Sequence, residues 1–246
     1  MVLAKLAAGG RIEGETLAGV DWAEAELSDL VLIDCQVEDA AFAASVLAGG
    51  RFERCRFLRC RFSHADLRET TFEDCRFADP AAGASFAFCR LDSARLARCD
   101  LTAVRFEGCD LYDLRLEDCN LTGARFARSS FGRAFGRKVE KIAAELVGCN
   151  LDLADLSGVR LPGCNLARTR LRETDLSGAD LEGADLTGAD LFQAIVDEAK
   201  LAGADLRGAE VSGLDLRRLA TYQDLKITPD QQFRLLDAMG IDVRPE

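Results

Sequence analysis

The chain has 246 residues, of which 48% are hydrophobic, and carries a formal net charge of −11. This acidic excess disfavours direct binding to nucleic acid and suits contact with a basic protein surface. No apolar run is long enough for a signal peptide or a membrane span, so we expect a cytoplasmic protein without membrane contact.

A large apolar residue returns every five positions from Ile12 to Leu216, with two short interruptions. This period fits neither the turn of a helix nor the alternation of a strand. Each repeat reads small–polar–large–x–x, as in ADLEG at 179–183, which directs one small and one large side chain inward. Such a unit cannot bury its large residue alone, so successive repeats must wind into a coil whose turns stack.

The cysteines follow the same repeat, because every one of them stands two residues before a large apolar residue. Elsewhere this position holds small residues such as Ala65, Thr70 and Ala179. Free cysteine is a small and frequently buried side chain, so we interpret the position as a steric one. We expect no disulfides, because side chains stacked in register point the same way, and no metal or cofactor. The ten cysteines are Cys35, Cys55, Cys60, Cys75, Cys89, Cys99, Cys109, Cys119, Cys149 and Cys164.

The first interruption, residues 78–85, separates Phe77 from Phe86 by nine residues, one repeat plus four. It contains Pro80 and Gly83, both loop-forming residues, which predict a short loop leaving one corner of the coil. We include Asp79 of this loop among the candidate partner-binding residues.

The second interruption, residues 132–145, preserves the five-residue count, but two further repeats here would place Lys141 inside the coil. Burying an unpaired lysine is too costly, so we expect an excursion of about a dozen residues. Apolar residues at helical spacing in its later part predict one or two helical turns. Loops on a rigid scaffold often carry binding residues, although a tolerated surface insertion is the alternative. The candidates here are Arg133, Phe135, Arg137, Lys138 and Lys141.

Aspartates recur one position before the large residue in the later repeats, in a position that elsewhere holds Asn150, Arg160 and Arg170. They are either simply outward polar residues or mimics of the phosphates of a nucleic acid. The candidates are Asp155, Asp175, Asp180, Asp185, Asp190 and Asp205.

The period stops after Leu216, where an open coil needs a cap. The segment TPDQ at 228–231 is a capping box with proline at the first helical position, and Gly240 is a stop signal. A helix from about 229 to 239 is therefore predicted to cover the last coil, either as a cap alone or as a cap and a dimer contact. The candidate dimer residues are Phe233, Leu236, Met239 and Ile241.

This pattern resembles the pentapeptide-repeat family. The resemblance implies an all-β fold, a right-handed quadrilateral β-helix of four repeats per turn, with a short C-terminal capping helix. Residues twenty apart would then stack on one face, as in the column of Cys35, Cys55 and Cys75. We expect one domain over 1–246, with coils at 10–77, 86–131 and 146–218, loops at 78–85 and 132–145, and a C-terminal helical module at 219–246.

Within that family the arrangement of a shorter loop, a longer loop and a helical end is similar to the Qnr/MfpA type of topoisomerase-protection proteins. The closing DLKITPDQQFRLLDAMGIDV also resembles the ending of Qnr chains. The N-terminal block is longer here, the first loop is shorter, and the second loop is basic.

This resemblance implies a homodimeric, DNA-mimicking rod that binds DNA gyrase or topoisomerase IV and protects it from quinolones or other poisons. The alternative is a generic pentapeptide-repeat scaffold that binds an unrelated protein. An enzyme is disfavoured, because the single histidine, His64, is predicted to face solvent and no catalytic motif stands out.

Overall fold

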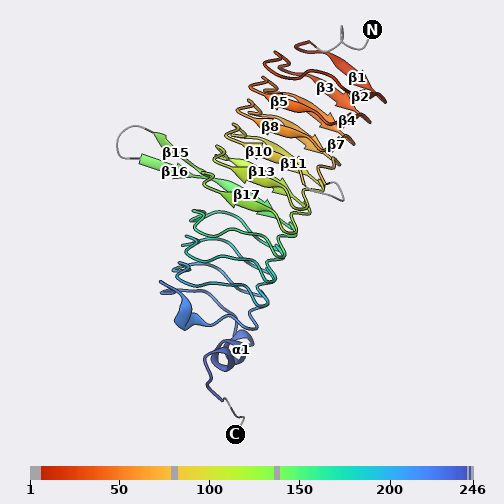
Figure 1. The fold of residues 1–246 in the computed structure, drawn as a ribbon. Coiled ribbons are helices and arrows are strands. Elements are labelled where there is room, and N and C mark those ends of the chain that lie inside the picture. Colours follow the sequence, from red (N-terminus) through yellow and green to blue (C-terminus); the bar gives the residue numbers. More distant parts are fainter. Residues whose placement is uncertain (1–6, 79–82, 136–138, 243, 245–246) are drawn as a thin grey trace.

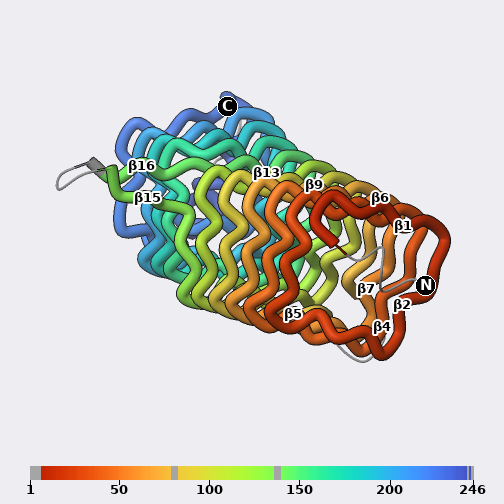
Figure 2. Tube along the Cα trace, turned by 90° about the horizontal axis from the view of Figure 1, so that it is seen from above, coloured from red at the N-terminus to blue at the C-terminus, as the bar shows by residue number. Residues whose placement is uncertain are grey.

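The computed structural model describes residues 7–78, 83–135, 139–242 and 244. The chain forms a right-handed quadrilateral β-helix, an elongated rod with a helix at its C-terminal end, so the predicted fold class is confirmed (Figure 1). Viewed from above, successive coils lie over one another in register (Figure 2). Among the described residues, no helix has the length and apolar character needed to cross a bilayer.

Short parallel strands make up the faces of the β-helix in its first part. A seven-stranded sheet contains β1 (Arg11–Glu13), β3 (Val31–Ile33), β6 (Arg51–Glu53), β9 (Thr71–Glu73), β11 (Arg95–Ala97), β13 (Leu114–Glu117) and β17 (Ala144–Val147). A five-stranded sheet contains β5 (Ala41–Ala43), β8 (Arg61–Ser63), β10 (Ser85–Ala87), β12 (Arg105–Glu107) and β14 (Arg125–Ala127). A three-stranded sheet contains β2 (Thr16–Ala18), β4 (Gln36–Glu38) and β7 (Arg56–Leu58). Single β-bridges continue the same pairing beyond Asn150.

The strand register shows how the two interruptions are absorbed. Neighbouring strands usually pair residues twenty apart, as Leu32 pairs with Phe52. Phe72 pairs with Leu96, which adds four residues to one coil, and Leu116 pairs with Leu146, which adds ten. The large residues on either side of each insertion stay in their columns, as Phe86 pairs with Phe62 and Leu146 pairs with Leu116.

The second interruption is a β-hairpin, so the predicted helical turns are wrong. Strands β15 (Gly132–Phe135) and β16 (Val139–Ile142) pair antiparallel and project from the side of the rod (Figure 1). The excursion has to return to the corner it left, and two extended strands satisfy each other's backbone groups on the way. The helical spacing was misleading because Leu146 already belongs to the next coil, where it is fully buried. Lys141 is exposed, as the cost of burying it predicted.

The core is a set of stacked columns of the large residues, and the longest aromatic one runs from Trp22 to Phe126. Phe62 lies between Phe42 and Phe86, with ring centroids 4.4 Å and 4.5 Å away. Phe106 and Phe126 extend the column, and their centroids lie 5.0 Å apart. Each ring is almost completely shielded from solvent by the coils above and below it. The core therefore depends on contacts between coils and not on contacts within one repeat.

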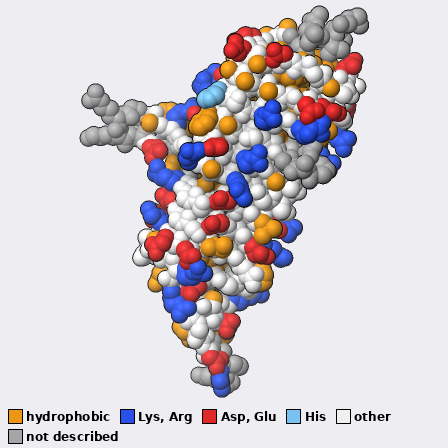
Figure 3. Space-filling view, in the orientation of Figure 1, with side chains coloured by type: hydrophobic (Ala, Val, Ile, Leu, Met, Phe, Trp, Pro, Cys, Tyr) orange, Lys and Arg blue, Asp and Glu red, His pale blue; other side chains and the backbone are white. Residues whose placement is uncertain are grey.

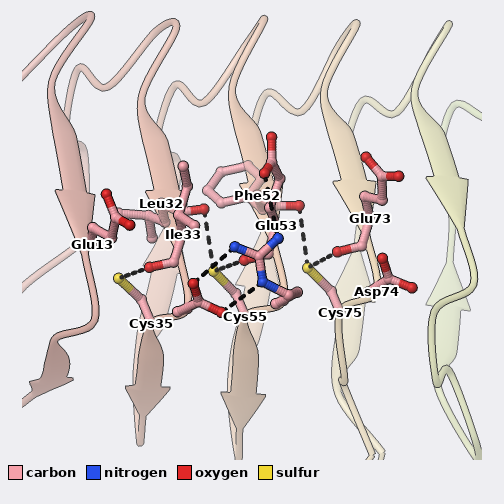
Figure 4. Close-up of polar contacts among 12 residues, drawn as sticks. Glu13, Leu32, Ile33, Cys35, Phe52, Glu53, Cys55, Glu73, Asp74 and Cys75 are labelled. Atoms are coloured by element: carbon pink, nitrogen blue, oxygen red, sulfur yellow. Dashed lines mark hydrogen bonds and ion pairs between the residues drawn. The ribbon is translucent and has the colours of Figure 1, made fainter.

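The ten cysteines are free and buried, which confirms the steric interpretation of their position. Figure 4 shows Cys35, Cys55 and Cys75 stacked on successive coils with their thiols directed at backbone carbonyls. The Cys55 thiol donates to the carbonyl oxygens of Leu32 and Glu53, each at 3.3 Å. The position therefore accepts a weak donor as well as a small apolar group.

The buried thiols predict slow chemistry in the native protein and a loss of stability in alkali. Burial raises the pKa of the Cys60 and Cys164 thiols from 9.0 to about 11. Because each thiol holds its proton more tightly in the folded than in the unfolded chain, it contributes to the free energy of unfolding. This contribution is fully present below pH 9.0 and is lost as the pH rises through about 11. We expect a bulky thiol reagent to label the native protein slowly, and the denaturant midpoint to fall above pH 9.0.

The matched variant replaces both Cys60 and Cys164 with alanine, which occupies the same position in other repeats. Its denaturant midpoint should fall less steeply over the same pH range. Rapid labelling of the native protein, or an unchanged pH dependence in the variant, would contradict the argument.

The C-terminal end is closed by helix α1 (Gln231–Ala238), which follows the 3-10 turn η2 (Leu216–Arg218). The helix lies where it was predicted, but it begins at Gln231 and not at Pro229. The Gln231 side chain accepts hydrogen bonds from the backbone N–H and hydroxyl of Thr228, which is one half of the predicted capping box. The other half does not form, because the Gln231 N–H donates to the Thr228 carbonyl and not to its hydroxyl. The Gln231 side-chain amide nitrogen also donates to the carbonyl oxygens of Leu206 and Ala209, at 2.6 Å and 2.7 Å. This buried glutamine therefore supplies a donor to the Ala209 carbonyl, for which no backbone donor is seen among the described residues, and a second donor to the Leu206 carbonyl, which already accepts from Ala209 N–H.

Candidate partner-binding surface

The hairpin is tied to the solenoid through Arg133 on β15. The Arg133 guanidinium donates to Oδ2 of Asp92 at 2.9 Å and of Asp110 at 3.2 Å, and it lies 4.7 Å from the ring centre of Tyr112. The Asp92 side chain is only 9% exposed, and its hydrogen bond raises the pKa of Arg133 above the ordinary value. On the opposite strand, Glu140 accepts from Arg160 at 2.9 Å. The sequence prediction treated Arg133 as a partner-binding residue, and the structure places it at the base of the hairpin as an anchor.

Phe135 lies further out on the hairpin and Lys141 lies directly opposite Arg133, and both are exposed to a partner. The Phe135 ring is 46% exposed and meets Tyr112 edge to face, with centroids 5.8 Å apart. The Lys141 ammonium lies 5.3 Å from the centre of the Phe135 ring. An exposed aromatic side chain with an adjacent cation is typical of a protein-binding anchor. The other loop candidates, Asp79, Arg137 and Lys138, lie outside the described residues.

The six candidate aspartates share a structural task that the sequence analysis missed. Each accepts, through Oδ1, a hydrogen bond from the backbone N–H two residues later, as in the 2.9 Å bond from Ser177 to Asp175. This Asx turn closes the corner of the coil, and it explains why Asp and Asn recur at this position. The other five are Asp155, Asp180, Asp185, Asp190 and Asp205.

The strand register distributes these aspartates over different faces. Asp155 pairs with Asp175 on one face, and Asp185 pairs with Asp205 on the opposite face. Asp180 and Asp190 belong to the remaining two faces, so the string that is regular in sequence winds around the coil.

Several of these carboxylates also contact arginines. Oδ2 of Asp190 accepts from Arg172 at 2.5 Å, and Oδ2 of Asp205 accepts from Arg207 at 2.7 Å. The Arg207 hydrogen bond lowers the pKa of Asp205. On the face shown in Figure 3, acidic and basic side chains are interspersed along the rod and do not form one continuous acidic strip. The main structural role of the aspartates is therefore to close the turns of the coil, and their contribution to surface charge is secondary.

The candidate dimer residues lie on or just after α1. Gln231 and Leu235, one helical turn apart, are buried against the last coil. This orientation leaves Phe233 50% exposed, and Ile241 after the helix is 46% exposed. Leu236 and Met239 are half-buried. An apolar surface therefore remains at the C-terminal end of the rod.

The residues whose contacts the sequence analysis missed are Asp92, Asp110, Tyr112 and Arg160. It placed Gln231 in the capping box but missed the bonds from this side chain to the last coil. Asp92 and Tyr112 are twenty residues apart, and Gly132 at the start of the hairpin follows Tyr112 by twenty. The twenty-residue stacking rule could therefore have identified the residues beneath the hairpin. Within the part of the chain that the structure describes, no group of His, Cys, Asp and Glu is placed to hold a metal ion.

The comparisons with known proteins agree with this geometry. The family model "Pentapeptide repeats" matches eight copies, over residues 35–74, 82–116, 99–135, 149–188 and 184–218. No curated protein sequence matches the chain. A trypsin-treated variant of QnrB1, described as a plasmid-mediated fluoroquinolone resistance protein, is 26% identical with a TM-score of 0.75, and the match covers 97% of this chain and 100% of that one. Full-length QnrB1 is 25% identical with a TM-score of 0.71, over 94% of this chain and 100% of that one.

The family model covers well over half of the chain, and the similarity to QnrB1 extends over nearly its whole length. The chain belongs to the pentapeptide-repeat family, and its structure is similar to that of the Qnr protein QnrB1.

Proposed function

We propose that this protein binds a type II topoisomerase, DNA gyrase or topoisomerase IV, and protects it from quinolones or other topoisomerase poisons. The observation that carries the proposal is the match to a fluoroquinolone resistance protein along 97% of the chain, at a TM-score of 0.75. The proposal places the protein in the cytoplasm, where such an enzyme acts on DNA.

The mechanism rests on charge and shape. Residues 146–216 hold six Lys and Arg against thirteen Asp and Glu, a net charge of −7. A rod carrying this charge can occupy the basic surface on which a topoisomerase holds duplex DNA, without binding nucleic acid itself. The hairpin then contributes a protein contact through Phe135. Less enzyme is left bound to DNA, so less is available to a poison of the enzyme–DNA complex.

The test is a supercoiling assay with purified gyrase, with and without a quinolone. The intact protein should restore supercoiling in the presence of the drug. Deleting residues 133–142 removes the ten inserted residues, so Leu146 again follows Phe131 by five positions and the coil stays in register. This deletion should abolish protection of gyrase, while circular dichroism should show that the fold is preserved.

A generic scaffold that binds an unrelated protein is the second candidate. The interspersed charge favours it, because ion pairs such as Arg172 with Asp190 reduce the resemblance to a phosphate backbone. If the intact protein is inert towards gyrase and topoisomerase IV over a wide concentration range, this candidate replaces the first.

Dimerisation through α1 is part of the proposal and gives a separate prediction. Replacing both Phe233 and Ile241 with aspartate places charge in the apolar surface at the C-terminal end. We expect light scattering to give twice the chain mass of 26.7 kDa for the native protein and the single chain mass for the variant. Replacing the exposed Gln232 with alanine is the control and should leave the dimer intact. A native protein that is monomeric at all concentrations would contradict the prediction.

A further inference from the structure

Three arginines form a column on the five-stranded sheet. The strands β8, β10, β12 and β14 are adjacent, and their register aligns Arg61, Ser85, Arg105 and Arg125. All three arginines are exposed. With strands roughly 4.8 Å apart, the column extends over about 14 Å of the rod.

These arginines form no ion pair with a described residue, unlike many others on the rod. Arg54 and Arg59, for example, donate to Asp34 and Asp39 on the preceding coil at 2.7 Å and 2.6 Å. Among the described residues, no carboxylate lies within 4.0 Å of Arg61, Arg105 or Arg125. Arg105 and Arg125 occupy directly paired positions, where like charges destabilise a sheet, and neither forms an ion pair with a described residue. Asp39 interacts with Arg61 only electrostatically. A charge column without ion pairs favours a role in binding an anionic partner.

An exposed aromatic pair runs along the other edge of the same sheet. The rings of His64 and Phe88 stack with centroids 5.3 Å apart, and Phe88 is 51% exposed. A side chain at Gly108 would place its Cβ 2.7 Å from the Phe88 ring, so glycine leaves room for the ring to lie flat. Between the two edges the register aligns Ser63, Ala87 and Glu107, and the Glu107 carboxylate is paired with Arg128.

The surface is hollowed at the arginine edge. A groove of about 370 Å³ is lined by Arg59, Arg61, Ser85 and Arg105, together with Gly83, Cys60 and Asp39. The sheet therefore offers guanidinium groups and a hydroxyl along one side, a shallow middle and an apolar ring along the other side.

We infer that this arginine–aromatic face binds an acidic segment of a partner protein, an extended stretch in which carboxylate and apolar side chains alternate. Alternation directs successive side chains to opposite sides, so carboxylates can meet the arginines while apolar groups meet Phe88. Guanidinium groups pair with carboxylates in bidentate geometry, and an exposed ring supplies an anchor. A nucleic acid is disfavoured as the occupant, because the net charge of −11 repels it. The inference does not depend on the partner being a topoisomerase.

The probe is a dye-labelled peptide of about eight alternating glutamates and leucines, long enough to cover the column at roughly 3.3 Å per residue. Fluorescence anisotropy with the full chain should show saturable binding that weakens with added salt. Replacing Arg61, Arg105 and Arg125 together with alanine should weaken binding at least about tenfold, and Phe88→Ala alone should weaken it about threefold.

A matched control removes the same charge from the neighbouring face. Arg51, Arg95 and Arg115 occupy the equivalent column of the seven-stranded sheet. This sheet is more acidic, because Glu53, Glu73 and Glu117 lie on its strands, and Arg115 forms ion pairs with Asp113 and Glu145. Replacing these three arginines with alanine should leave peptide binding within about twofold of the native value. Melting curves should show that both triple variants remain folded.

The inference is overturned if the peptide does not bind, or if both triple variants weaken binding equally. Tighter binding of a single-stranded oligonucleotide of matched charge would also overturn it, because the face would then recognise polyanions without regard to their apolar groups. A matched lysine–leucine peptide should not bind.

Discussion

Replacing Phe62 with alanine is expected to lower the free energy of unfolding by about 3–5 kcal/mol. The ring is 1% exposed and lies between Phe42 and Phe86 in the aromatic column. Its loss leaves a cavity that cannot close, because the hydrogen bonds between coils hold the strands at a fixed spacing. Denaturant unfolding followed by circular dichroism measures the effect.

Phe88 provides the control for this prediction. It belongs to the same protein and carries the same side chain, but its ring is 51% exposed at a corner of the coil. Phe88→Ala should change the free energy of unfolding by less than about 0.5–1 kcal/mol. Equal losses in the two variants would contradict the prediction, because the two rings differ greatly in the area that they bury.

Replacing Arg133 with alanine is expected to release the hairpin from the solenoid. Asp92 depends on this arginine, because its Oδ1 is buried with no donor among the described residues and its Oδ2 accepts from the guanidinium. A buried carboxylate that loses its partner costs about 1–3 kcal/mol. Hydrogen exchange should show the loss as faster exchange of the β15 and β16 amides, while the amides of the coils stay protected.

A double variant distinguishes the cost of leaving the Asp92 carboxylate unpaired from the other effects of losing Arg133. Replacing Asp92 together with Arg133 removes the buried carboxylate that Arg133→Ala leaves unpaired. Part of the lost protection of the β15 and β16 amides from hydrogen exchange should therefore return. Arg128→Ala breaks a surface ion pair with Glu107 and should cost less than about 1 kcal/mol. Arg133→Ala exchange rates that match those of Arg128→Ala would rule out the anchoring role. If the hairpin contacts a topoisomerase, Arg133→Ala should also weaken protection, because the Phe135 ring would no longer be held against Tyr112.

The local repeat explains why so much of the fold could be predicted. The position of each cysteine two residues before a large residue implied a small buried position, and all ten cysteines occupy one. The cost of burying Lys141 correctly predicted an excursion from the coil. Such inferences need only the chemistry of one repeat and its neighbours in sequence.

The candidate site was less predictable, because its residues meet only through the stacking of coils. Asp92, Tyr112 and Arg133 belong to three separate passages of the chain and come together beneath the hairpin. The helical spacing in 132–145 was misleading, since a pattern of side chains does not show which backbone groups find partners. Likewise, the regular spacing of the aspartates predicts their faces, but it does not show that each carboxylate accepts the hydrogen bond that closes a corner.

The sequence by itself determined the coil, its buried columns, its two interruptions and its C-terminal helix, because a five-residue period has one low-cost way to bury its large side chains. Only the tertiary structure decided that the longer interruption is a hairpin anchored by Arg133, that the aspartates close corners, and that three unpaired arginines align on one sheet. These features depend on the register between coils, which is set by the four and ten inserted residues and by contacts about twenty residues apart.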